Sequence, residues 1–155
     1  MQTHRRPKVT SLACGLLLLA GMTGAKATDV FACVSPGCVQ EIPIHVEAVF
    51  LDDLSAPALQ RYAWAYQVTI RNRTDVPVTL MRRYWRVING LGGVEEVSGD
   101  GVLGLQPFIE PDGMHRYTSW VVLTTPQGLM EGHYEMETPD GTVLRTRIPP
   151  FELSM

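Results

Sequence analysis

Lysine is absent from the chain after residue 27, and positive charge is scarce there. The nine basic residues of that part are all arginine and stand against sixteen acidic residues, a net charge of −7. Proteins that bind nucleic acid through its phosphates need a basic surface, so the composition argues against a nucleic-acid partner. Arginine does suit fixed contacts with carboxylates or phosphates, because its planar guanidinium donates two parallel hydrogen bonds.

Long apolar runs are also few. The run from Leu12 to Met22 is too short to span a bilayer, so no stable membrane span is expected. It follows basic residues and precedes Ala25-Lys26-Ala27, an order typical of a cleaved secretory signal. The alternative is a true translation start at Met22. Residues 1–27 are therefore interpreted as a signal-like or misassigned segment, and residues 28–41 as a linker.

Cysteine occurs only three times. Cys14 lies at the start of the apolar run, where a lipid-attachment cysteine is not expected, and Cys33 and Cys38 flank a Val-Ser-Pro-Gly turn. That spacing can close a small disulfide loop in an oxidising compartment. No second cysteine pair follows to complete a zinc site. The sequence leaves open whether Cys33 and Cys38 pair or remain thiols.

Helical periodicity is missing from residue 42 onward, where apolar side chains recur at every second position. The clearest case runs from Tyr62 to Ile70, in which aromatic and branched residues alternate with small or polar ones. This period places successive side chains on opposite faces of a strand. Further strands are predicted at 44–50, at 76–80 continuing through a bulge near 81–83 into 84–88, and at 94–97, 116–123, 129–136 and 142–148.

Turn residues separate these strands. Asn89-Gly90, Pro111-Asp112-Gly113 and Pro139-Asp140-Gly141 combine the fixed φ of proline or the tolerance of asparagine with glycine at positions of positive φ. About seven short strands with regular turns predict an all-β fold for residues 42–155. The expected architecture is an antiparallel β-sandwich of immunoglobulin or fibronectin type III kind, with a small closed barrel as the main alternative.

A glycine pattern and an arginine group suggest an anion site. Gly99, Gly101 and Gly104 match G-x-G-x-x-G, which lets a backbone approach a pyrophosphate. Leu105-Gln106-Pro107 cannot start the helix that this motif requires, so a loop linking two strands is favoured. Such a loop can still cradle an anion through its backbone N–H groups. Arg82, Arg83 and Arg86 could supply charge, and alternation puts Arg82 and Arg86 on one face.

A second group could bind a cation. Glu131, His133 and Glu135 project from the same face of one predicted strand and offer oxygen and nitrogen ligands. They form a linear array rather than a cage, so a solvated polar face is favoured and no cofactor is firmly predicted. A nucleophile with a base, such as a G-x-S-x-G motif would provide, is missing from the sequence. The chain is therefore predicted not to be an enzyme.

The order and spacing of motifs from about Ile42 to Leu153 resemble the ApaG family. The matching segments share aromatic strand residues, glycine turns and prolines in the family's order: Tyr62-Ala63-Trp64-Ala65-Tyr66, Val68-Thr69-Ile70-Arg71-Asn72, Arg83-Tyr84-Trp85-Arg86, Asn89-Gly90, Gly99 to Pro107, Tyr117-Thr118-Ser119, Thr125 to Met136, and Ile148-Pro149 with Phe151. Two positions depart from the pattern. Trp120 stands where the family usually carries a small residue, and Met114 where an acid is common.

The resemblance implies a fibronectin type III-like sandwich, a cytoplasmic location, and a link to cobalt resistance and magnesium efflux, so Mg²⁺ or Co²⁺ is the cofactor class to consider. A periplasmic or secreted protein is the alternative if residues 1–27 act as a signal. The first functional hypothesis is a non-catalytic module that binds a protein partner or forms a homodimer. The second is a binder of pyrophosphate, nucleotide or Mg²⁺/Co²⁺ at the Gly99 to Gly104 loop. An enzyme acting on dinucleoside polyphosphates ranks last.

Overall fold

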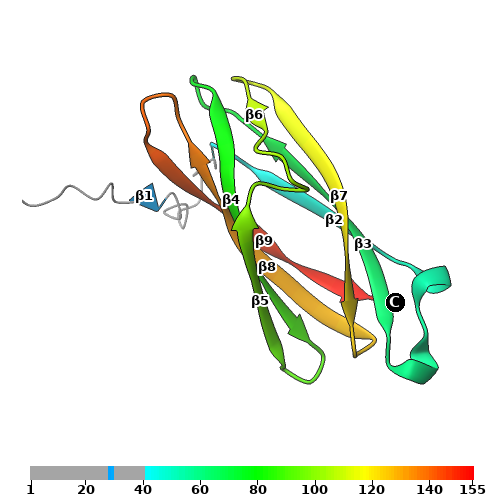
Figure 1. The fold of residues 1–155 in the computed structure, drawn as a ribbon. Helices are drawn as coiled ribbons and strands as arrows, with labels where there is room; N and C mark the ends of the chain where they lie inside the picture. The colour runs from blue at the N-terminus through cyan, green and yellow to red at the C-terminus, as the bar shows by residue number, and fades with distance from the viewer. Residues whose placement is uncertain (1–27, 30–40) are drawn as a thin grey trace, which may run out of the picture.

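Two antiparallel sheets pack face to face in the computed structural model, which describes residues 28–29 and 41–155 (Figure 1). This arrangement is the two-layer sandwich of immunoglobulin and fibronectin type III domains. The prediction of an all-β antiparallel sandwich is confirmed. The only helical turns among the described residues are two short 3₁₀ helices, η1 (Asp52–Leu54) and η2 (Pro57–Leu59).

The two sheets differ in size. The smaller sheet has the order β2-β3-β7, with β2 at Ile44–Phe50, β3 at Tyr62–Arg71 and β7 at Met114–Leu123. The larger sheet has the order β1-β9-β8-β4-β5, with β1 at Thr28–Asp29, β9 at Val143–Ser154, β8 at Gln127–Glu137, β4 at Val78–Asn89 and β5 at Val94–Asp100. The short β6 (Phe108–Ile109) also pairs with β4. Seven of these strands have seven or more residues, as the sequence predicts.

Most strand positions agree with the predicted ones, and the bulge does too. The β4–β8 register shifts between Leu80 and Arg82, next to the predicted change of phase. The main difference is β9, which continues past its predicted end at Ile148 through two prolines to Ser154. Proline is tolerated there because the β8–β9 register also shifts between Met130 and Gly132, and a bulge leaves backbone groups unpaired.

Some predictions concern residues that the structure does not describe. Cys33, Cys38 and the signal-like residues 1–27 lie outside the described ranges, so those predictions stay open. Within the predicted linker, Thr28–Asp29 pairs in parallel with Leu144 and Arg145 of β9. Among the described residues, no helix is long and apolar enough to cross a membrane.

The core lies between the facing sides of the two sheets. Alternation in β3 turns Trp64 and Tyr66 inward, where they meet Trp85 of β4 and Tyr134 of β8. The ring centroids of Tyr66 and Trp85 are 5.6 Å apart at 64°, and those of Trp85 and Tyr134 are 6.1 Å apart at 87°. Edge-to-face pairs of this kind add about 0.5–1.5 kcal/mol each beyond area burial. The core therefore fixes which strand faces point outward and carry any binding site.

Candidate functional site

The outer face of the larger sheet carries both groups of residues that the sequence singled out. Alternation along β4 and β8 turns them outward, because Trp85 and Val87 of β4 and Tyr134 and Met136 of β8 are buried. The strand register sets three pairs side by side: Arg82 with Glu135, Tyr84 with His133, and Arg86 with Glu131. Side chains predicted to bind an anion thus lie beside those predicted to bind a cation.

The two glutamates of this face are held by arginines. Arg86 Nη1 lies 2.8 Å from Glu131 Oε1, and Arg147 Nη2 lies 3.9 Å from the other oxygen of the same carboxylate. Arg145 Nη2 lies 3.1 Å from Glu135 Oε1. The contacts at 2.8 and 3.1 Å are charge-assisted hydrogen bonds, and the one at 3.9 Å is an ion pair without a hydrogen bond. A cation bound by Glu131 and Glu135 would have to compete with these guanidinium groups.

Tyr84 and His133 form the centre of the face. Their rings stack with centroids 4.9 Å apart and an interplanar angle of 24°. A hydrogen bond with Glu96 of β5 raises the pKa of Tyr84 above its ordinary value. Beside them is a shallow pocket of about 180 Å³, lined by Arg82, Arg83, Tyr84, Ser98, His133 and Glu135. In the part of the chain that the structure describes, no group of three or more His, Cys, Asp or Glu side chains is placed to hold a metal ion.

The glycine loop has a structural explanation at two of its positions. Gly101 has φ of +54°, and a Cβ there would lie 2.0 Å from the carbonyl oxygen of Leu105. This close approach occurs because Val102 and Leu105 pair in a tight turn, each N–H donating to the other's carbonyl at 2.8 and 2.9 Å. Gly104 has φ of +77° with open space around it. The chain then continues into β6, so no helix follows the motif.

The backbone of the loop is contacted by Arg83. Its Nη1 donates hydrogen bonds to the carbonyl oxygens of Asp100 (3.0 Å) and Gly101 (2.9 Å), and its guanidinium packs against Gly99. Carbonyl oxygens therefore face the arginine at this point of the loop. Arg82 instead lies 3.5 Å from the Asp100 carboxylate, and both side chains are exposed. The anion site predicted at Gly99, Gly101 and Gly104 with Arg82 and Arg86 stays a prediction.

A buried tyrosine cluster lies on the inner side of Arg83. The hydroxyls of Tyr117 on β7 and Tyr134 on β8 are 2.5 Å apart and join the two sheets. Burial raises the pKa of both phenols well above the ordinary value, while the Arg83 charge lowers it in part. Both hydroxyls therefore keep their protons at neutral pH, and in the bond that joins them one O–H donates to the oxygen of the other. The hydrogen bonds of Arg83 with the loop carbonyls, on the other side of this cluster, favour an architectural role for Arg83.

The outer face of the smaller sheet has a different character. Its central strand contributes only Ala63 and Ala65 at one end, and larger apolar side chains rise on both sides. They enclose a groove of about 420 Å³ lined by Leu51, Leu54, Arg61, Ala63, Ala65, Thr118, Ser119, Trp120 and Val122. Trp120 is 64% exposed and Leu54 is 61% exposed. Exposed apolar side chains gathered in one place are typical of a surface that binds another molecule.

A local hydrogen-bond network positions the Leu54 wall of this groove. Leu51 continues the smaller sheet by donating its N–H to the Ala63 carbonyl at 2.8 Å. The Ser55 hydroxyl then donates to the Leu51 carbonyl at 2.7 Å and accepts the Ala63 N–H at 3.0 Å. These bonds fold the η1 turn back against the sheet. Leu54 is thus fixed in its exposed position by hydrogen bonds of the residues on either side of the turn.

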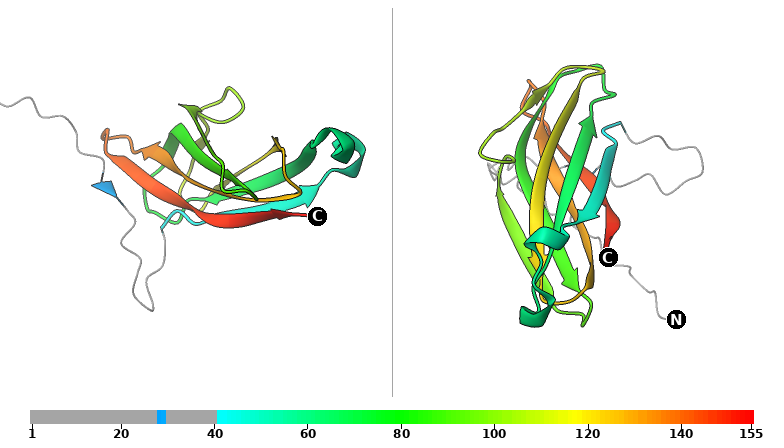
Figure 2. Two further views of the ribbon diagram at one scale, coloured as in Figure 1. Left: turned by 90° about the horizontal axis from the view of Figure 1, so that it is seen from below. Right: turned by 90° about the vertical axis from the view of Figure 1, so that its right-hand side faces the viewer.

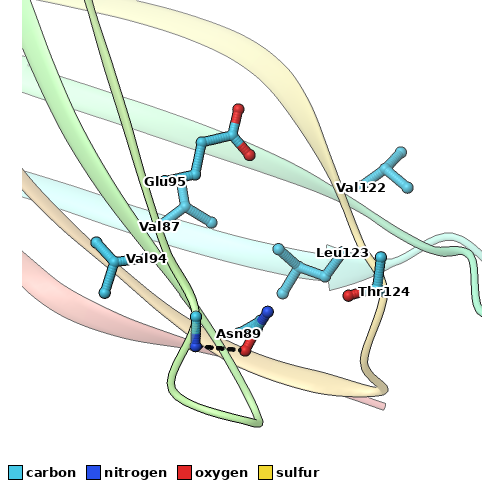
Figure 3. A pocket seen from close by; sticks show the side chains of 8 residues that line it. Val87, Asn89, Val94, Glu95, Val122, Leu123 and Thr124 are labelled. Carbon is cyan, nitrogen blue, oxygen red and sulfur yellow. Dashed lines mark hydrogen bonds between the residues drawn. The ribbon is translucent and has the colours of Figure 1, made fainter.

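A second hollow of about 270 Å³ lies between β5 of the larger sheet and the end of β7 (Figure 3). Its walls come from both sheets: Val87, Asn89, Gly93, Val94, Glu95, Val122, Leu123 and Thr124. Asn89 closes the bottom, because its side-chain oxygen accepts the Gly93 N–H at 2.8 Å. Val122 lines both this hollow and the groove, so β7 separates two neighbouring depressions, of which the groove is the more apolar.

The groove could not be recognised from a sequence motif, because alanine and valine have no functional group that indicates a site. One signal was present in the sequence. Trp120 departs from the ApaG pattern, and its place on the face shared with Thr118 and Val122 follows from alternation. That its neighbour across the sheet is Ala65 could not be predicted, since the register of β3 with β7 is set by the tertiary fold.

Comparisons with known proteins agree on one family. A family model described as the ApaG domain matches residues 52–138. "Protein ApaG" of Agrobacterium fabrum (strain C58) is 46% identical over 114 residues, which cover 74% of this chain and 88% of that protein. "Protein ApaG" of Proteus mirabilis (strain HI4320) is 44% identical over 115 residues, covering 74% of this chain and 92% of that protein.

Solved structures show the same relationship. The crystal structure of a putative ApaA protein from Bordetella pertussis has a TM-score of 0.72 and 34% sequence identity, and covers 74% of this chain and 93% of that one. Residues 1–27 fall in the part of the chain that lies before the matched family model.

Proposed function

Because the chain belongs to the ApaG family, we propose that it is a non-catalytic module that binds another protein through the outer face of its smaller sheet. The observation that carries the proposal is the apolar groove with a floor of Ala63 and Ala65 and a wall formed by Trp120. Tryptophan is one of the residue types enriched among those that contribute most to protein–protein binding. A second copy of the chain is one partner that the test must consider.

The proposal assigns any role in cobalt and magnesium homeostasis to the bound protein. The resemblance to the family supports that link, and it also supports a cytoplasmic location. On the larger sheet, Glu131 and Glu135 make ion pairs with arginines, which favours a structural role for both carboxylates. The module would then influence cation handling by binding a transporter or regulator rather than by holding the ion itself.

The test compares two variants with matched exposure. Trp120 is 64% exposed on the groove and Phe108 is 58% exposed on β6, outside it. Tagged wild type, Trp120→Ser and Phe108→Ser chains are expressed in the source cell, crosslinked, and purified, and co-purified proteins are quantified by mass spectrometry. We expect a partner retained by wild type and Phe108→Ser and reduced about tenfold or more with Trp120→Ser. Identical recovery from all three chains would refute the proposal.

The same proteins are examined alone by light scattering during gel filtration. A homodimer that dissociates with Trp120→Ser and persists with Phe108→Ser would identify the partner as a second copy. Monomers throughout would leave a different protein as the partner.

The small-ligand alternative rests on the loop motif and on Arg82 and Arg86. It predicts heat on titration with pyrophosphate, ATP, Mg²⁺ or Co²⁺ at about millimolar concentration, lost with Arg82→Gln. The Arg83 contacts with the loop carbonyls favour an architectural role for the glycines instead. A flat titration with all four ligands would remove this alternative.

A further inference from the structure

Strand β7 is an edge strand without the usual protection against pairing. Exposed edges are normally blunted by proline, by charge, by a bulge or by a covering element. The ten residues of β7, Met114–Leu123, contain no proline, glycine or acidic residue. Their register with β3 continues without a shift from Tyr62↔Leu123 to Arg71↔Met114. β7 therefore offers a long and regular edge.

The other edges of the described sandwich differ from β7. β9 contains Pro149 and Pro150 at a bulge, and part of it pairs with β1. β5 carries Glu95, Glu96 and Asp100. β2 runs beside β9 in the packed sandwich, as Figure 2 shows. β7 is thus the edge that combines length, regularity and low charge.

Alternate residues of β7 form hydrogen bonds with β3, and one observed bond shows which residues these are and which backbone groups point away from β3. The Asn72 N–H donates to the Gly113 carbonyl at 2.9 Å, which makes this pair a hydrogen-bonded one. Hydrogen-bonded and non-hydrogen-bonded pairs alternate along an antiparallel ladder. The residues between the hydrogen-bonded pairs therefore turn their backbone N–H and C=O groups away from β3. These residues are Met114, Arg116, Thr118, Trp120 and Val122.

Two depressions lie on either side of this free edge, one mainly apolar and one lined by both apolar and polar side chains. Trp120 and Val122 line the groove of about 420 Å³ on the outer face. Val122 and Leu123 also line the hollow of about 270 Å³ between β7 and β5 (Figure 3). An added strand would point alternate side chains to opposite faces, so one set would lie near Trp120 and the other near the hollow. Backbone pairing and apolar contact would act together.

Charge on the smaller sheet decides the chemistry of the occupant. β3, β7 and the residue before β3 carry Arg61, Arg71 and Arg116, and the one acidic side chain of the three strands, Glu47, lies on β2 at the opposite edge from β7. A peptide with carboxylates near its ends complements these guanidinium groups. A second copy of β7 has no carboxylate to offer Arg116, and two bodies of net charge −7 repel each other.

From these observations we infer that β7 accepts an extended segment of another protein by β-strand addition, with apolar residues at alternate positions and acidic residues at the flanks. This inference rests on the proposed function and specifies how the partner binds. Main-chain hydrogen bonds supply affinity in this mode of recognition, and pockets for alternate side chains supply specificity.

The probes are synthetic peptides of about nine residues, close to the length of β7. The set has Val, Ile or Tyr at alternate positions, Thr between them, and Asp at both ends. Binding is followed on the ¹⁵N-labelled protein by amide chemical shifts and hydrogen exchange. We expect shifts and slowed exchange at Arg116, Thr118, Trp120 and Val122. Methylating alternate peptide amides on the paired side should weaken binding about tenfold or more, since several hydrogen bonds are lost.

Two proline variants provide a matched pair. Thr118→Pro removes a free N–H from the β7 edge, whereas Ser98→Pro removes one from the β5 edge, because Tyr84 and Ser98 form a non-hydrogen-bonded pair by the same phase argument. Proline is tolerated at such edge positions. Thr118→Pro should reduce affinity about tenfold, with Ser98→Pro unchanged. If Thr118→Pro does not fold, the methylated peptides test the same hydrogen bonds without any variant.

Three results would overturn the inference: no peptide of the set binding at about 1 mM, shifts that map to β5 or β2, or equal affinity for methylated and unmethylated peptides. The proposed function is judged separately. If Trp120→Ser loses a cellular partner while the peptides fail to bind, the proposed protein binding is supported and the inference of β-strand addition is refuted.

Discussion

The outer faces of the two sheets differ in whether their side chains satisfy one another. On the larger sheet Arg86, Glu131 and Arg147 form a linked set of ion pairs, and Tyr84 stacks on His133. On the smaller sheet Trp120 and Leu54 stand above alanines and remain exposed. The charged residues of the larger sheet are thus paired with one another, whereas the apolar side chains of the smaller sheet are available to contact another molecule.

This difference shows that the residues recognised as a motif in a sequence need not lie on the surface that binds a partner. Arginine, glutamate and histidine suggest an ion-binding site in a sequence, but neighbouring strands can bring them together in complementary pairs. Alanine and valine do not suggest a binding site in a sequence, although a sheet face built from them is apolar and stays exposed unless another element covers it.

The glycine loop should respond to substitution as a structural element. Gly101→Ala places a Cβ 2.0 Å from the Leu105 carbonyl oxygen at φ of +54°, so we expect unfolding free energy to fall by about 3 kcal/mol. Gly104→Ala has an unfavourable φ but open space, and should cost about 1 kcal/mol. Urea denaturation measures both. Equal small effects would mean that the loop is not constrained as described, and would favour a ligand-binding role for its glycines.

The ion pairs of the larger sheet should contribute modestly and should be coupled. Arg86→Met and Glu131→Gln are measured singly and together in a double-mutant cycle. We expect a coupling energy of about 0.5–1 kcal/mol, reduced by salt, because both side chains are partly exposed. A coupling of zero would show that these charges are independent, and the face would then be available for a ligand.

Acidification should weaken the smaller sheet through His115 on β7. Partial burial lowers the pKa of His115 below its ordinary value. The unfolded chain therefore binds a proton at higher pH than the folded chain, so this contribution to stability is present above about pH 6.5 and is lost as the pH falls. His115→Phe should flatten that part of the stability curve between about pH 7 and pH 5. An unchanged pH dependence in the variant would contradict the assignment.

Removing Trp120 should affect stability least. Because the side chain is 64% exposed, Trp120→Ser should change unfolding free energy by less than about 0.5 kcal/mol. The same variant should lose most of the fluorescence that iodide quenches, since Trp64 and Trp85 are buried. A large loss of stability would show that Trp120 packs as part of the fold, and the contrast between the two faces would disappear.

Strand positions were predictable because their signals are local. Alternation from Tyr62 to Ile70 and the turn at Pro139-Asp140-Gly141 depend on residues next to one another in the chain, and β3 follows the former closely. The extension of β9 through Pro149 and Pro150 was not predictable, since proline is acceptable there because β9 itself bulges at these two residues opposite β8. The face of Arg83 likewise depends on the bulge between Leu80 and Arg82.

Period, turn chemistry and motif spacing predict the sandwich, most strand positions and the family, because they are properties of neighbouring residues. Only the tertiary structure decided which of the sequence's suggestive residues meet. Arg86 and Glu131 are 45 positions apart, and Ala65 and Trp120 are joined only through the β3–β7 register. Such contacts depend on strand order and register, which follow from burying both inner faces together and leave no signature at any single position.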